Sequence, residues 1–156
     1  MLDEPTFDSL PTSEDFYLDG EPDEKWAREH YLGKDIEFAH KRYYTYCSLS
    51  VLQDWSHVGI RAFRYYIFGA CRYLQDEKSR DDVDVYNALA GLLLRKFTEH
   101  PKELYVISPY IAVFSEWAIK NHEKFGASEY EHIYGDIKEK YKELHKLALK
   151  STSREI

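Results

Sequence analysis

The chain has 156 residues, of which 44% are hydrophobic, 28 are acidic and 21 are basic. This length and composition are typical of one globular domain, and two cysteines are too few for a disulfide framework, so the sequence predicts a cytoplasmic protein. The N-terminus lacks the basic and apolar run of a secretion signal, and no stretch of eighteen apolar residues predicts a membrane span.

Charge is concentrated near the N-terminus. Residues 1–29 contain ten acids and two bases, Lys25 and Arg28, whereas residues 30–156 contain 18 acids and 19 bases. An acidic leader on a nearly neutral body favours a protein partner with a basic surface and repels phosphate backbones, which argues against a nucleic-acid partner.

The first 22 residues predict an extended acidic arm. They contain three of the five prolines, and their apolar residues follow neither a helical nor a strand period. Phe7, Phe16 and Tyr17 are unusual in a purely solvated tail and indicate that the arm docks on a surface, in cis or in trans. The expected organisation is therefore an arm over residues 1–22, a helical bundle over residues 23–150 and a C-terminal tail over residues 151–156.

The first half of the bundle predicts three helices. Pro22 followed by two acids starts one helix, which ends near Gly33. A single long helix is expected from Asp35 to Trp55, apolar on most faces and therefore central. The stretch from Ser56 to Gln75 predicts a third helix with one apolar stripe and one stripe of aromatic and arginine side chains.

The second half continues the helical pattern. Ser79 or Asp81 caps a helix that ends before His100-Pro101, and Pro109 opens another that ends at Gly126. Ser128 and Glu131 fit a capping box that opens the last helix. No pair of strands is evident, so the sequence predicts an all-α fold, a single bundle of about five helices with the extended arm.

The segment Ala62–Leu74 reads as an alanine, an aromatic, an arginine and two aromatics, followed by an apolar run. It resembles the shared stretch of an uncharacterised bacterial family of small helical proteins, in which a proline stands near the position of Phe68-Gly69. Ile107-Ser108-Pro109 resembles a helix opening of the same family. The resemblance spans about residues 50 to 120 and implies a helical fold without assigning an activity.

Two glutamate–histidine pairs have the three-residue spacing of ferritin-like di-iron proteins. These pairs are Glu37 with His40 and Glu129 with His132. Such a site requires the two pairs to face each other and one additional carboxylate from each of two further helices. A ferritin-like metal protein is therefore one alternative, and the competing interpretation is that these histidines are ordinary edge residues.

Arg95 and His100 have the R-x4-H spacing of the helical nucleases found in prokaryotic toxin and defence systems. The resemblance is confined to these two residues and implies that they act together on an RNA phosphate. An arginine fork holds a phosphate while a histidine moves a proton, so the chemistry is consistent. The competing interpretation is an exposed arginine near a helix end followed by an ordinary His-Pro terminus.

The preferred hypothesis is a binding module without catalytic residues, metal or cofactor, and specifically an inhibitor of the immunity-protein or antitoxin type that acts on a basic partner such as a nuclease. Three arginines in residues 56–75 are expected to bind an anion or to dock the arm: Arg61, Arg64 and Arg72. The residues expected to contact the partner are Asp3, Glu4, Asp8, Glu14, Asp15, Phe16, Tyr17, Asp19, Glu21, Asp23 and Glu24.

Overall fold

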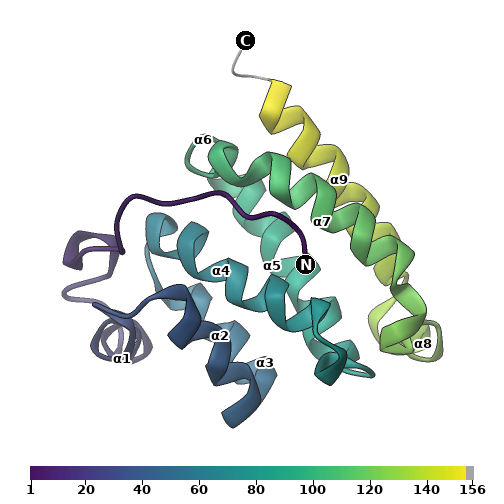
Figure 1. The fold of residues 1–156 in the computed structure, drawn as a ribbon, viewed down its shortest axis with the longest axis horizontal. Helices are drawn as coiled ribbons and strands as arrows, with labels where there is room; N and C mark the ends of the chain where they lie inside the picture. Colours follow the sequence, from purple (N-terminus) through teal and green to yellow (C-terminus); the bar gives the residue numbers. More distant parts are fainter. Residues whose placement is uncertain (154–156) are drawn as a thin grey trace. The chain divides into compact units, whose positions relative to one another are not determined.

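The computed structural model describes residues 1–153 and contains no β-strand among them, which confirms an all-helical protein. The helices are more numerous than the five or so that the sequence predicts, because two expected helices are interrupted. They are α1 (Pro22–Tyr31), α2 (Ile36–Thr45), α3 (Ser48–Asp54), α4 (Ile60–Gln75), α5 (Val83–Glu99), α6 (Pro101–Leu104), α7 (Ser108–Lys120), α8 (Glu131–Tyr134) and α9 (Ile137–Ser153) (Figure 1).

Two compact units make up the chain, and their boundaries differ from the expected arm and bundle. One unit comprises Thr6–Tyr73 and holds α1, α2, α3 and most of α4. The other comprises Met1–Pro5 together with the chain from Leu74 onward. The predicted arm is thus divided after Pro5. The predicted tail overlaps α9, which continues to Ser153, and its last three residues, 154–156, lie outside the described residues.

Three large aromatic side chains form the centre of the Thr6–Tyr73 unit. Tyr31, Trp55 and Tyr66 are fully buried, and the Trp55 and Tyr66 rings stack with their centroids 5.1 Å apart. The Tyr66 hydroxyl lies 2.7 Å from the backbone carbonyl of Tyr31 and 2.8 Å from that of Lys34, and its single proton is shared between the two acceptors. This contact ties α4 to the chain where α1 ends.

The long helix expected from Asp35 to Trp55 is divided into α2 and α3. The division lies at Tyr46, whose backbone is extended, and the chain restarts at Ser48. This break allows the Trp55 indole N–H to donate to the Tyr43 hydroxyl at 2.9 Å. In one straight helix, residues twelve apart would be separated by about 18 Å along the axis. Burial of Trp55 therefore requires the interruption that helical periodicity did not predict.

The second unit has its own core around α5, α7 and α9. Helices α7 and α9 pack along their lengths, and α5 packs against α9 (Figure 1). Tyr86 stacks on Phe125 with the ring centroids 4.3 Å apart, and its hydroxyl donates to the Ala118 carbonyl. The Tyr141 hydroxyl donates to the Tyr86 carbonyl at 2.6 Å. Two buried tyrosines thus join α5 to α7 and α9.

Local signals predicted some helix ends correctly and others wrongly. The Glu24 carboxylate accepts the Glu21 amide in a capping box before α1, and α5 ends before Pro101 as expected. The caps predicted for α5, Ser79 or Asp81, are wrong, because the Asp82 side chain accepts the Val85 amide. The end predicted at Gly126 is also wrong for α7, which stops at Lys120. Gly126, with φ 63°, instead closes the short 3-10 helix that follows.

The start of the last long helix differs from the prediction. The Ser128 hydroxyl does not cap Glu131 but donates to the Glu123 carboxylate at 3.2 Å. The short helix α8 stops at Gly135, which has φ 73°, and Asp136 then accepts the Glu139 amide at the start of α9. The capping box was therefore a misleading match, and the Gly135-Asp136 pair is the signal that opens α9.

Gly59, the residue before α4, packs closely against the arm. Its amide donates to the Asp15 carbonyl at 3.0 Å, and an added Cβ would lie 2.5 Å from that oxygen. Gly59→Ala is expected to lower the free energy of unfolding by about 1–3 kcal/mol, because backbone must move. Gly91→Ala is the matched control. Gly91 is an exposed position of α5, and a Cβ added there meets nothing within 4 Å.

The control substitution is expected to raise the free energy of unfolding by about 0.5–1 kcal/mol, because alanine loses less backbone entropy than glycine in a helix. Urea denaturation followed by circular dichroism measures both variants. Equal effects of the two substitutions would contradict the close packing at Gly59.

Candidate functional site

Residues 7–16 of the predicted arm dock on α4 of their own unit through aromatic side chains. The Phe7 ring contacts Tyr65 and Phe68, with centroid distances of 5.6 and 6.0 Å. Phe16 is only 4% exposed and contacts Tyr66. The arm therefore docks in cis over these residues. Phe16, which the sequence predicted as a partner contact, belongs to the core because its apolar ring fills the space beside α4.

Several carboxylates of the arm are exposed to solvent, unlike the rings of Phe7 and Phe16. Asp8, Glu14 and Asp19 are exposed and form no ion pair with any lysine or arginine of the described chain. Asp15 accepts the Thr12 amide at 2.8 Å, and Asp23 lies 3.9 Å from the His57 imidazole. Asp15 is thus used in a local backbone contact and Asp23 lies near a histidine, whereas no described arginine neutralises Asp8, Glu14 or Asp19.

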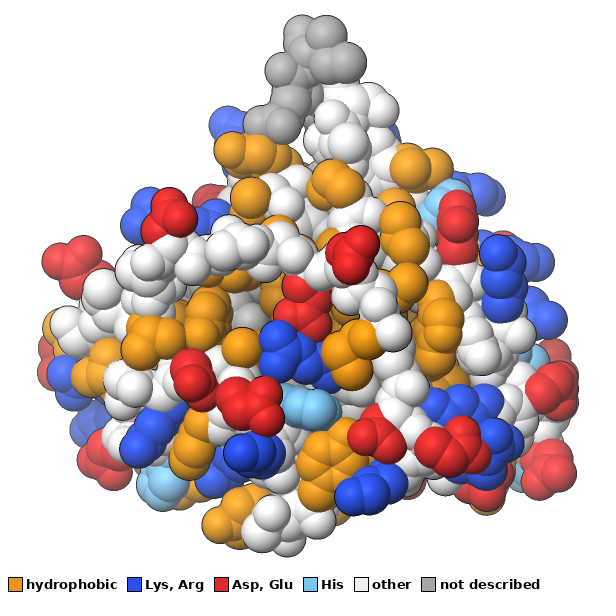
Figure 2. Space-filling model, viewed as in Figure 1, with side chains coloured by type: hydrophobic (Ala, Val, Ile, Leu, Met, Phe, Trp, Pro, Cys, Tyr) orange, Lys and Arg blue, Asp and Glu red, His pale blue; other side chains and the backbone are white. Residues whose placement is uncertain are grey.

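Residues 14–24, here called the acidic segment, form the most distinctive surface of this unit. The segment contains six acids and neither lysine nor arginine. Between its acids lie Tyr17 and Leu18, whose side chains are 45% and 55% exposed. On the face shown in Figure 2, acidic side chains are interspersed with basic and apolar ones, so charge alternates over that surface. The segment combines negative charge with two apolar side chains that a partner could cover.

The three predicted arginines have different surroundings. Arg72 pairs with Glu37 of α2, with an N–O distance of 3.6 Å. Arg61 and Arg64 line a pocket of about 500 Å³ against arm residues 6–15, which include Asp8 and two further acids. Arg61 is exposed and forms no ion pair with the described residues. Phe7 and Phe16 therefore supply the aromatic contacts that dock the arm, and Arg61 adds no ion pair to them within the described chain.

Asp3 and Glu4 belong to the other unit. Leu2 beside them donates its backbone amide to the Gln75 side chain at 2.8 Å, which fixes the first residues on that unit. Residues 1–5 line a pocket of about 600 Å³ with Val106, Pro109, Tyr110 and Val113. The predicted run of partner contacts is therefore divided between two units, and only the acidic segment forms a continuous part of it.

No family model, curated protein or solved structure matches this chain. The family resemblance of Ala62–Leu74 stays a prediction. Within residues 1–153 no helix is both long and apolar enough to cross a bilayer.

The proposed metal ligands lie in different surroundings. Glu37 pairs with Lys41 and Arg72, and the His40 ring contacts Tyr44. Glu129 and His132, which the sequence predicted as the second pair, are exposed. Among the residues described, no three or more His, Cys, Asp or Glu side chains gather as a metal site would require.

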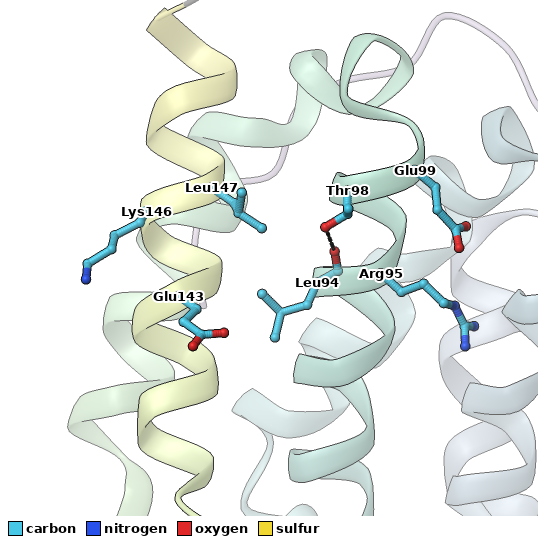
Figure 3. Close-up of a pocket in the computed structure, with 7 residues that line it drawn as sticks. All are labelled: Leu94, Arg95, Thr98, Glu99, Glu143, Lys146 and Leu147. Atoms are coloured by element: carbon cyan, nitrogen blue, oxygen red, sulfur yellow. Dashed lines mark hydrogen bonds between the residues drawn. The ribbon is translucent and has the colours of Figure 1, made fainter.

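Arg95 is exposed on α5 and lines an open groove of about 540 Å³ between α5 and α9. Figure 3 shows Leu94 and Leu147 pointing toward each other across the groove, while Arg95 and Glu99 lie on the side of α5 away from α9. His100 is half-buried at the C-cap of α5, where its amide donates to the Lys96 carbonyl. His100 does not contribute to the lining of this groove, so the groove does not combine the two predicted catalytic groups.

A second pocket in the Thr6–Tyr73 unit was missed by sequence reasoning. It has a volume of about 390 Å³ and is lined by Asp23, Trp26, Arg42, Tyr46, Ser50, Val51 and Asp54. These residues come from α1, from α2 and its C-cap, and from α3. Their separation in the sequence explains why no motif revealed them, although Asp54 is the one acid between Lys41 and Gln75.

Asp54 occupies an unusual environment in this pocket. It is half-buried and accepts a hydrogen bond from the Tyr31 hydroxyl. Burial raises the pKa of Asp54 above its ordinary value, although the Tyr31 hydrogen bond and the charges of Arg42, His57 and His30 oppose the rise. Burial and the Asp54 carboxylate also raise the pKa of Tyr31, which keeps this hydroxyl protonated as a donor.

Asp54→Asn tests this environment through the pH dependence of stability. The raised pKa means that the folded protein binds more protons than the unfolded chain between about pH 3.9 and the folded pKa, so ionisation of Asp54 lowers stability as pH rises through this interval. Asparagine removes this titration and retains an acceptor for Tyr31. Relative to the variant, the wild type is expected to be more stable at pH 4 than at pH 7, as measured by thermal unfolding. A difference that is independent of pH would contradict the assignment.

Proposed function

We propose that this chain is a small protein-binding module, and that the acidic segment is its docking surface for a protein with a basic surface. The observation that carries the proposal is the exposure of Glu14, Asp19 and Glu21 without a neutralising lysine or arginine among the described residues. Carboxylates of this kind keep their full electrostatic attraction for an outside partner.

The exposed Tyr17 and Leu18 supply the apolar part of the proposed surface. Tyrosines are frequent anchors at protein interfaces, because the ring buries a large area with little loss of conformational entropy. The charges would guide the approach of the partner, and Tyr17 would contribute to retention. Docking of Phe7 and Phe16 on α4 supports this arrangement, because it holds the acidic segment on a folded surface.

The more specific form of the proposal is an inhibitor of the immunity-protein or antitoxin type. A nuclease exposes a cationic cleft for its substrate, and a carboxylate cluster that occupies this cleft would compete with the phosphate backbone. No geometry of the described residues supports catalysis by Arg95 and His100 or metal binding by the carboxylate–histidine pairs. Protein binding therefore remains the preferred function.

Co-expression with the product of the neighbouring open reading frame tests this proposal. A basic nuclease is expected to copurify with the chain and to lose activity, and the association rate is expected to fall at least ten-fold between 50 and 500 mM salt. Association that is insensitive to salt, or a partner whose contact surface is acidic, would contradict the role of the acidic segment.

A further inference from the structure

The pocket lined by Arg42 and Asp54 holds two opposite charges that do not pair with each other. No ion pair within 4.0 Å joins Arg42 to any carboxylate of the described residues. The guanidinium instead lies over aromatic rings, 4.4 Å from the Tyr46 centroid and 5.6 Å from the Trp26 centroid. Its Nε atom is buried and has no hydrogen-bond partner among the described residues. The aromatic rings therefore hold Arg42 in place without neutralising it.

Asp54 is only partly satisfied in the same pocket. One carboxylate oxygen, Oδ2, accepts the Tyr31 hydroxyl, and the other accepts no hydrogen bond from a described residue. A half-buried carboxylate gains most from a cationic donor, because charge-assisted hydrogen bonds offset the loss of hydration. The pocket thus offers a guanidinium to an anionic group and a carboxylate to a cationic group.

We infer that this pocket binds a free basic α-amino acid, with the ligand carboxylate on Arg42 and the ligand ammonium group on Asp54. A zwitterion can form a charge-assisted hydrogen bond with each of the two groups, whereas a neutral ligand such as a nucleobase offers a charge to neither. A pocket of about 390 Å³ falls within the range of small-molecule sites, about 300–1,000 Å³.

The rim of the pocket accounts for the preference for a basic side chain. Asp23 lines the rim with an exposed carboxylate, which lies 3.9 Å from the His57 imidazole. Trp26 and Tyr46 are 37% and 57% exposed and add apolar surface at the rim, against which the methylene stem of a long basic side chain can lie. The same rim would repel an acidic side chain. This inference is independent of the proposed partner protein, because it rests on Arg42 and Asp54 rather than on the acidic segment.

Isothermal titration calorimetry with three probes tests the inference on the wild-type protein. L-arginine is expected to bind with one site per chain. Agmatine lacks the carboxylate and Nα-acetyl-L-arginine lacks the ammonium group, and each is expected to bind at least ten-fold more weakly. Failure of L-arginine to bind at millimolar concentration, or equal affinity for all three probes, would overturn the inference.

Two variants assign the contacts to their residues. Arg42→Gln is expected to weaken L-arginine at least ten-fold while leaving agmatine unchanged, because agmatine offers nothing to that guanidinium. Asp54→Asn is expected to weaken L-arginine similarly while leaving Nα-acetyl-L-arginine unchanged. The matched control is Lys41→Gln, an exposed cation on the same helix whose side chain is 73% accessible. It is expected to bind L-arginine as the wild type does.

Circular dichroism is the check that each variant is folded. The comparison of the three probes on the wild type remains valid even if a variant unfolds. Tight binding of guanosine monophosphate, with displacement of L-arginine, would overturn the inference in favour of a nucleotide site. Loss of L-arginine binding in Lys41→Gln together with retention in Arg42→Gln would also overturn it.

Discussion

Replacing four exposed carboxylates of the acidic segment with amides is expected to weaken binding of a basic partner by about ten- to a hundred-fold. The variant combines Glu14→Gln, Asp19→Asn, Glu21→Gln and Asp23→Asn. The physical reason is the loss of long-range attraction, which lowers the association rate more than it raises the dissociation rate. Surface plasmon resonance at several salt concentrations measures both rates. The association rate of the variant is expected to depend less on salt concentration than that of the wild type.

The matched control removes four exposed carboxylates from the other unit, by Glu99→Gln, Glu129→Gln, Glu131→Gln and Glu143→Gln. Both quadruple variants change the net charge by the same amount, so a nonspecific charge effect would reduce binding equally. The proposal expects only the first variant to lose binding. Equal loss in both variants, or no loss in the first, would remove the acidic segment from the interface.

Trp55→Ala is expected to lower the free energy of unfolding by about 3–5 kcal/mol. The Trp55 side chain is fully buried, stacks on Tyr66 and lies 4.6 Å from the Tyr31 ring centroid. Truncation removes these ring contacts, leaves a cavity, and deprives the Tyr43 hydroxyl of the indole donor. Urea denaturation monitored by circular dichroism measures the change.

Trp26→Ala serves as the comparison, because Trp26 is 37% exposed and contributes mainly to the rim of the Arg42 pocket. Its expected cost is about 1 kcal/mol, since more than a third of its area already contacts water. Trp55→Phe separates the two effects, because it keeps a ring in the core and removes only the N–H donor. A loss for Trp55→Ala no larger than that for Trp26→Ala would contradict the central position of Trp55.

Helix caps and turns were predictable because they depend on neighbours in the chain. Pro22 at the start of α1 and Pro101 after α5 each act within one helical turn. The cap of α5 was predicted one to three residues too early, at Ser79 or Asp81 instead of Asp82. The capping box at Ser128 failed for an equally local reason. Glu123 lies five residues before Ser128 and competes for the same hydroxyl. A short motif thus predicts an end only when no neighbour offers a better partner.

The candidate sites were less predictable, because their residues are separated in sequence. Phe16 lies among acidic residues in the sequence and was therefore predicted to contact a partner. The structure shows that it is buried against Tyr66 instead. The Arg42–Asp54 pocket carries no spacing signature, since its walls come from α1, α2 and α3. Counting charged residues along the sequence located the acidic segment. It missed this pocket, because Arg42 and Asp54 have opposite charges and lie twelve residues apart.

By itself, the amino-acid order determined the helical class, some helix ends and the concentration of negative charge before residue 25, because each follows from short-range periodicity, capping or simple counting. Only the tertiary structure decided that α2 and α3 are separate, that Phe16 is buried and that Arg42 lies beside Asp54 without an ion pair. These features depend on side chains that meet after the chain folds back, and the energy of such contacts is absent from any local pattern.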